Sequence, residues 1–114
     1  MARILIVEDD PDVLSLMEHI ILDDGHQVAT AETVAIANIL LCAQHFDLVI
    51  CDVNLPDGNG LHIADRANAM GAKALIVTGH GLSLRPGTLS AYEYMLKPVR
   101  SGELLAGIAR RLAG

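Results

Sequence analysis

Acidic side chains come directly after two short apolar segments of this 114-residue chain. Glu8 and Asp9 follow the first segment, residues 4–7, and Asp52 follows another, residues 48–51. Continuous apolar runs of this length are typical of strands buried on both faces of a parallel sheet. Because ligands of open α/β sheets bind beyond the carboxyl ends of the strands, we expect the three carboxylates to converge at one sheet edge.

Two more reactive side chains occupy equivalent positions later in the chain. Thr78 follows the apolar residues 74–77, and Lys97 follows the short segment 94–96. Converging carboxylates repel one another unless a hard cation lies among them, and Mg²⁺ prefers a few carboxylates together with waters and a phosphate. With Mg²⁺, an ammonium and a hydroxyl around it, Asp52 can act as a nucleophile toward a phosphoryl donor. The cation and Lys97 would stabilise the charge on the transferring oxygens.

Each of these residues also has an ordinary structural explanation. Asp10 followed by Pro11 is a strong signal for a helix N-terminus, so the neighbouring acids fit a helix cap. Asp52 taken alone fits a loop residue. It is the joint placement of charged and polar groups at four different strand ends that favours a phosphoryl-transfer site.

The chain as a whole alternates between strand and helix patterns. The predicted strands are 3–7, 26–31, 48–51, 74–77 and 94–96, and the predicted helices are 11–25, 33–43, 61–70 and 101–112. This order predicts an α/β domain with a doubly wound, five-stranded parallel sheet and helices on both faces. Between the last two strands, Gly79, Gly81, Pro86 and Gly87 oppose a regular helix. We therefore expect a fourth helix there to be short, at about 88–92, or absent.

Composition and charge argue against several classes of function. Aromatic residues make up only 3% of the chain, so stacking platforms for bases are nearly absent. A net charge of −6, without a Lys/Arg cluster, argues against direct nucleic-acid binding and against a basic membrane anchor. The first apolar run is too short for a signal peptide or a membrane span, so a cytoplasmic location is expected. Cys42 and Cys51 have no metal-ligand spacing and are expected to be buried.

At these positions the sequence resembles the receiver domains of bacterial two-component response regulators. The resemblance covers essentially the whole chain and rests on four blocks: ILIVEDDPDV (4–13), DLVICDVNLPDGNG (47–60), LIVTG (75–79) and YMLKPV (94–99). It implies a flavodoxin-like sheet with strand order 2-1-3-4-5. It also implies a signalling module that takes a phosphoryl group from a histidine kinase or histidine phosphotransferase, and then regulates a downstream protein partner or drains a phosphorelay.

The resemblance assigns roles to the acidic residues and to the loop that follows them. Asp52 matches the phosphoacceptor. Glu8 and Asp9 match the acidic pair that holds Mg²⁺, with Asp9 as the direct ligand and Glu8 acting through water. Asn54, two residues past the acceptor, matches the position whose backbone carbonyl ligates the metal and whose side chain tunes the lifetime of the phosphoryl group.

It also assigns roles to the residues near the last two strands. Thr78 matches the switch hydroxyl that turns toward the phosphoryl group, and Lys97 matches the lysine beside it, with a cis peptide bond to Pro98. Tyr94 matches the aromatic switch position, although a partly buried strand aromatic is an alternative. His80 lies at a position that tunes phosphoryl lifetime, and its alternative is a solvated loop residue.

Other readings of the same residues stay open. A haloacid-dehalogenase-type phosphatase also uses a strand-end aspartate and Mg²⁺, but it needs a second acid where this chain has Asn54. An interaction module that is never phosphorylated would have no need of Asp9, Asp52, Thr78 and Lys97 together. A nucleotide-binding domain is disfavoured, because no GxGxxG or Walker motif follows the first strand. We therefore expect a single receiver domain, residues 1–114, without an output domain and with no enzymatic activity beyond its own phosphorylation and dephosphorylation.

Overall fold

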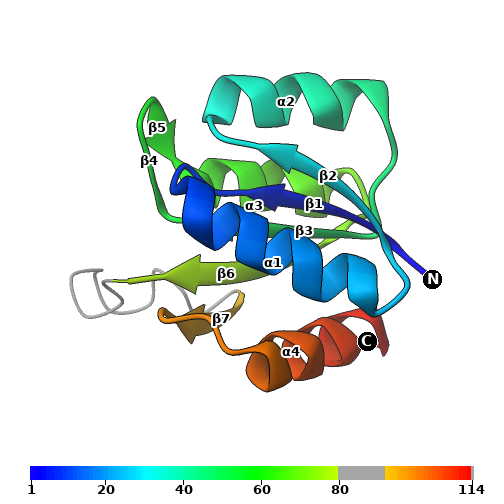
Figure 1. Ribbon diagram of the computed structural model, residues 1–114. Coiled ribbons are helices and arrows are strands. Elements are labelled where there is room, and N and C mark those ends of the chain that lie inside the picture. The colour runs from blue at the N-terminus through cyan, green and yellow to red at the C-terminus, as the bar shows by residue number, and fades with distance from the viewer. Residues whose placement is uncertain (80–91, 114) are drawn as a thin grey trace.

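Five parallel strands form the central sheet of the structure, a computed structural model that describes residues 1–79 and 92–113 (Figure 1). The strands are β1 (Arg3–Val7), β2 (Gln27–Ala31), β3 (Leu48–Asp52), β6 (Lys73–Thr78) and β7 (Glu93–Leu96). Their order is β2-β1-β3-β6-β7, and every neighbouring pair is parallel. Because β4 and β5 belong to a separate hairpin, this is the order 2-1-3-4-5 that the resemblance implied.

Helices cover both faces of this sheet (Figure 1). On one face lie α1 (Pro11–Asp23) and α4 (Ser101–Ala113), and on the other lie α2 (Val34–Ala43) and α3 (Gly60–Ala69). Successive strand residues point to opposite faces, so the strands contribute to two separate aliphatic cores, one under each pair of helices. None of the helices in residues 1–79 and 92–113 is both long and apolar enough to cross a membrane.

The order of the strands places a topological switch point between β1 and β3. From β1 the chain passes to β2 on one side, and it then returns to β3 on the other side of β1. The connections therefore diverge at the carboxyl ends of β1 and β3, which is the position where open α/β sheets generally bind their ligands. The residues that follow these two strands are Glu8 and Asp9 after β1, and Asp52 at the end of β3.

Helix caps agree with the signals in the sequence. The side chain of Asp10 accepts hydrogen bonds from the backbone amides of Asp12, at 2.9 Å, and Val13, at 3.4 Å. Pro11 occupies the first position of α1, where its missing amide hydrogen costs no hydrogen bond. Gly25 follows the helix with a φ of 92°, a conformation that glycine adopts without strain.

A small antiparallel hairpin between β3 and α3 was not predicted from the sequence. It consists of β4 (Asn54–Leu55) and β5 (Gly58–Asn59). At its turn, the carboxylate of Asp57 accepts hydrogen bonds from the backbone amides of Val34, at 2.8 Å, and Ala35, at 3.0 Å. These two bonds lower the pKa of Asp57. The loop that follows Asp52 is thus anchored to the N-terminus of α2.

The environment of the two cysteines corrects one prediction. Cys51 lies buried in β3, as expected, whereas Cys42 is exposed. Cys42 lies on the side of α2 that faces away from the sheet, because Ala37 and Leu41 form the buried side of this helix. The predictions for His80 and for a short helix at 88–92 fall on residues 80–91, apart from Tyr92, and therefore lie outside the described part of the chain.

Candidate functional site

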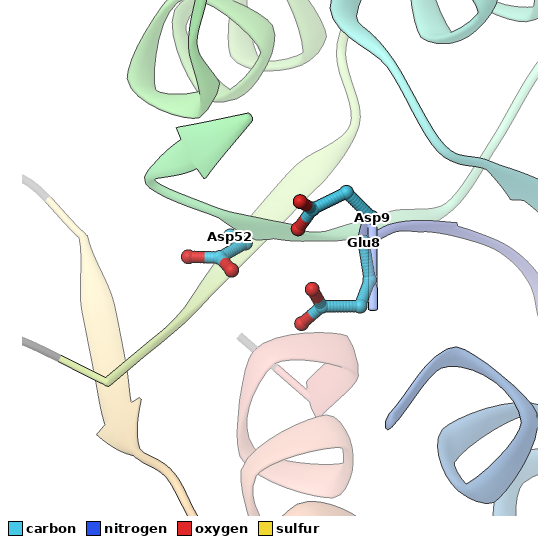
Figure 2. Close-up of side chains that lie close together, drawn as sticks. All are labelled: Glu8, Asp9 and Asp52. Carbon is cyan, nitrogen blue, oxygen red and sulfur yellow. The ribbon is translucent and has the colours of Figure 1, made fainter. Parts of the chain in front are cut away.

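Three carboxylates converge at the ends of β1 and β3, as their positions in the sequence predict (Figure 2). One oxygen from each of Glu8, Asp9 and Asp52 lies within 4.8 Å of the other two. The parallel register pairs Val7 with Cys51, so the carboxyl ends of β1 and β3 lie side by side at the same edge of the sheet. In Figure 2 the side chains of Glu8 and Asp9 both extend toward Asp52.

The three acids differ sharply in burial. Glu8 is fully buried and Asp52 is 6% exposed, whereas Asp9 is open to solvent. Burial raises the pKa of Glu8, and the nearby ammonium of Lys97 opposes this shift. The cluster therefore consists of two buried carboxylates beside a third that faces solvent.

The side chain of Lys97 joins the two buried acids. Its Nζ donates a hydrogen bond to Oδ2 of Asp52 at 2.8 Å and lies 2.7 Å from Oε1 of Glu8. The contact with Glu8 is a close ion pair between a fully buried carboxylate and a half-buried ammonium. Burial works to lower the pKa of Lys97, but Asp52 and Glu8 outweigh it and raise the value. Lys97 therefore holds its positive charge within the acidic cluster.

The other expected site residues surround this cluster at different depths. Thr78 ends β6 and is buried, and its backbone oxygen accepts a hydrogen bond from the amide of Lys97 at 2.9 Å. Asn54 is exposed, and its backbone amide donates a hydrogen bond to Oδ1 of Asp52 at 3.2 Å. Tyr94 is 51% exposed on β7, and the Lys97–Pro98 peptide bond is cis.

Gly60 contributes to the site, although it was not predicted as a functional residue. Its amide donates to the backbone oxygen of Val53 at 2.8 Å. A Cβ at this position would lie 1.7 Å from the backbone oxygen of Asp52, so only glycine fits. Gly60 directly precedes the predicted helix 61–70, where glycine is an ordinary cap residue, so no signal in the sequence singles it out.

The chemistry of these groups fits a bound Mg²⁺. Mg²⁺ takes oxygen ligands and keeps several waters, and it is usually held by one or two carboxylates. Clustered carboxylate oxygens are present, and the exposed side of Asp9 leaves room for waters. The carboxylate of Glu8, which is fully buried and is paired with Lys97, has lone pairs left that would accept from a metal-bound water.

The two exposed acids that follow Glu8 should differ in what they do. We expect Asp9→Ala to weaken Mg²⁺ binding, because it removes one of the three clustered carboxylates. Asp10→Ala should leave Mg²⁺ binding nearly unchanged and lower the free energy of unfolding by about 0.5–2 kcal/mol, as for other lost N-caps. Calorimetric titration with Mg²⁺ and urea denaturation of both variants measure the two effects. A larger loss of Mg²⁺ affinity in Asp10→Ala than in Asp9→Ala would contradict this assignment.

Comparison with known sequences points to one family. The family model of the response regulator receiver domain matches residues 4–109. The alginate biosynthesis transcriptional regulatory protein AlgB of Pseudomonas putida is 33% identical over 115 residues, which cover 96% of this chain and 26% of that protein. A two-component response regulator of Oryza sativa subsp. indica is 36% identical over 108 residues, which cover 90% of this chain and 16% of that protein. The chain thus spans about a quarter or less of the length of these relatives.

Solved structures agree with the sequence comparison. A CheY-like receiver domain protein from Methanospirillum hungatei has a TM-score of 0.87 and 30% identity, over 99% of this chain and 94% of that one. The response regulator TrrA of Thermotoga maritima, in complex with Mg²⁺ and BeF, has a TM-score of 0.87 and 28% identity, over 98% of this chain and 100% of that one. With the family match over most of its length, this chain belongs to the response regulator receiver domain family, the signalling modules of two-component systems.

Proposed function

We propose that this receiver domain accepts a phosphoryl group on Asp52 from a histidine kinase or histidine phosphotransferase, with Mg²⁺ as cofactor. The observation that carries the proposal is the position of Asp52, whose carboxylate contacts the ammonium of Lys97 at 2.8 Å and lies within 4.8 Å of the carboxylates of Glu8 and Asp9 at the switch point of the sheet. Membership of the family supports it, as does the similar structure of TrrA with Mg²⁺ and BeF.

The geometry prepares Asp52 for attack on phosphorus. Its Oδ2 accepts a hydrogen bond from Lys97 and its Oδ1 accepts one from the backbone amide of Asn54, so the carboxylate has little freedom to rotate. In the transfer, an Asp52 oxygen forms the new bond to phosphorus while the bond from phosphorus to the donor histidine nitrogen breaks, and the imidazole keeps that electron pair. Mg²⁺ held by Glu8, Asp9, Asp52 and the backbone carbonyl of Asn54 would supply charge that offsets the phosphoryl oxygens.

Lys97 and Thr78 connect this chemistry to the edge of the sheet. After transfer, the ammonium of Lys97 can contact a phosphoryl oxygen in place of Oδ2 of Asp52, and the Thr78 hydroxyl can turn toward the same group. The hydrogen bond between the Lys97 amide and the Thr78 oxygen ties both movements to β7, where Tyr94 is half-exposed. A change at Asp52 would then alter the surface that β7 presents to a protein partner in the cytoplasm.

Phosphorylation by a small donor tests the proposal. With acetyl phosphate and Mg²⁺, intact-mass measurement should show one added phosphoryl group on the wild type and on Asp12→Asn, a control at an exposed acid outside the cluster. Asp52→Asn should show none, because the amide is a poor nucleophile, and chelation of Mg²⁺ should abolish labelling of the wild type. Equal labelling of Asp52→Asn and wild type would overturn the assignment. No labelling of any protein would favour the unphosphorylated interaction module instead.

A further inference from the structure

The outward face of α2 is entirely apolar. The helix has no charged residue along its length, and its exposed residues are Ala35, Ile36, Ile39, Cys42 and Ala43. Ile39, at the middle of this face, is 66% exposed, and Ile36 is 44% exposed. A surface helix normally carries polar or charged residues on its solvent side. In α2 the one amide side chain, Asn38, is instead half-buried beside Arg66.

Charges of opposite sign lie beside the two halves of this helix. At its start, Glu32 is exposed and Asp57 binds the amides of Val34 and Ala35. Along its second half, Arg66 reaches across from α3: its Nη2 lies 2.9 Å from Sγ of Cys42, and its Nη1 donates to Oδ1 of Asn38 at 3.4 Å. The apolar face is therefore bordered by carboxylates at its beginning and by a guanidinium along its second half.

We propose that α2 is a homodimer interface that packs antiparallel against α2 of a second copy of this chain. In a two-fold symmetric contact, a residue on the axis faces itself and the others face their symmetry partners. With the axis at Ile39, Ile39 packs against the partner's Ile39, and Ala35 packs against the partner's Ala43. The two alanines lie one helical turn on either side of Ile39, and their small side chains let the two helices approach closely.

Charge favours a second copy over other occupants. The chain carries a net charge of −6, so two copies repel each other through most pairs of surfaces, but the α2 face places no charge against itself. The antiparallel arrangement also brings Glu32 and Asp57 toward the partner's Arg66, whose contacts with Asn38 and Cys42 lie about 6 and 12 Å along the helix from its start. An anionic membrane would instead be repelled by these two acids. The inference does not depend on the phosphoryl chemistry proposed above.

The oligomeric state in solution tests the proposal directly. Sedimentation of the full chain over a range of concentrations should show a reversible dimer for the wild type. Ile39→Glu should give a monomer throughout that range, because it buries two facing carboxylates. Leu22→Glu is the matched control on α1, since Leu22 is 50% exposed, and it should leave the dimer intact. A monomeric wild type, or a dimer that Ile39→Glu does not weaken, would refute the proposal.

A charge swap tests the antiparallel geometry. Glu32→Arg and Arg66→Glu should each raise the dissociation constant of the dimer by about tenfold, because each places like charges together at both ends of the contact. The double variant Glu32→Arg/Arg66→Glu should bind more tightly than either single variant, since the two new charges face each other across the axis, while Asp57 keeps it short of the wild-type dissociation constant. In a Cys42→Ser background, Ile39→Cys should form an intermolecular disulfide under mild oxidation. Additive weakening in the double variant, or failure of that disulfide to form, would exclude this packing.

Discussion

Gly60→Ala is expected to lower the free energy of unfolding by about 3 kcal/mol or more and to abolish phosphorylation of Asp52. The added Cβ would lie 1.7 Å from the backbone oxygen of Asp52 and 2.8 Å from its carbonyl carbon. Neither backbone atom belongs to a flexible group, because Asp52 is paired with Val77 in the sheet. Relief of the clash must therefore move either the start of α3 or Asp52 itself.

Gly102→Ala provides the matched control for this change. Gly102 is the second residue of α4, and a Cβ there meets no atom within 4 Å. An alanine in a helix is favoured over glycine by about 0.5–1 kcal/mol, so this variant should be at least as stable as the wild type. Urea denaturation of both variants and intact-mass labelling with acetyl phosphate measure the effects. Wild-type stability together with full labelling of Gly60→Ala would show that the close approach is not required.

The sheet could be predicted closely because its strands are buried on both faces. β1 has the predicted bounds, and β3 extends one residue beyond the prediction, to Asp52. Every residue of β3 is buried, which is why its apolar run stands out from the surrounding sequence. The fold class and the convergence of strand-end side chains follow from such runs together with the rule for ligand sites in open α/β sheets. The strand order came from the family resemblance instead.

Contacts between distant segments could not be predicted in this way. The hydrogen bonds from Val34 and Ala35 to Asp57 join residues more than 20 positions apart. The local sequence around Asp57 indicates a turn, but it contains no information about which helix the turn caps. The prediction that Cys42 is buried was wrong for a related reason. A helix that is apolar almost all round has little periodicity to show which face packs on the sheet.

The sequence predicted which residues form the candidate site, but it did not predict how deeply each is buried or which of them are in contact. The sequence places Glu8 and Asp9 side by side, whereas in the structure the first is fully buried and the second is exposed. Both residues lie beyond Val7, the last residue of β1, so the strand pattern in the sequence does not indicate which of them is buried. The bridging position of Lys97 depends on how β6 and β7 pair, and it follows from no spacing within the chain.

The bridging position of Lys97 leads to the last prediction, which concerns stability without metal. We expect Lys97→Met to lower the free energy of unfolding of the metal-free protein by about 3–5 kcal/mol, because removal of one partner leaves buried charges uncompensated. Glu8 is fully buried and Asp52 nearly so, and Lys97 contacts both at 2.7 and 2.8 Å. Arg110→Met is the matched control, since it removes the more exposed ion pair with Glu93 and should cost at most about 1 kcal/mol.

Two further measurements separate this electrostatic effect from a loss of packing. Addition of Mg²⁺ should stabilise Lys97→Met more than it stabilises the wild type, because a cation at the carboxylates replaces the missing positive charge and no longer competes with an ammonium for their oxygens. Glu8→Gln/Lys97→Met should recover part of the lost stability without metal, because the fully buried carboxylate is gone. Urea denaturation with and without Mg²⁺ gives all of these values. If Lys97→Met costs no more than Arg110→Met, or if Mg²⁺ stabilises it less than the wild type, then Lys97 does not hold the buried acids together.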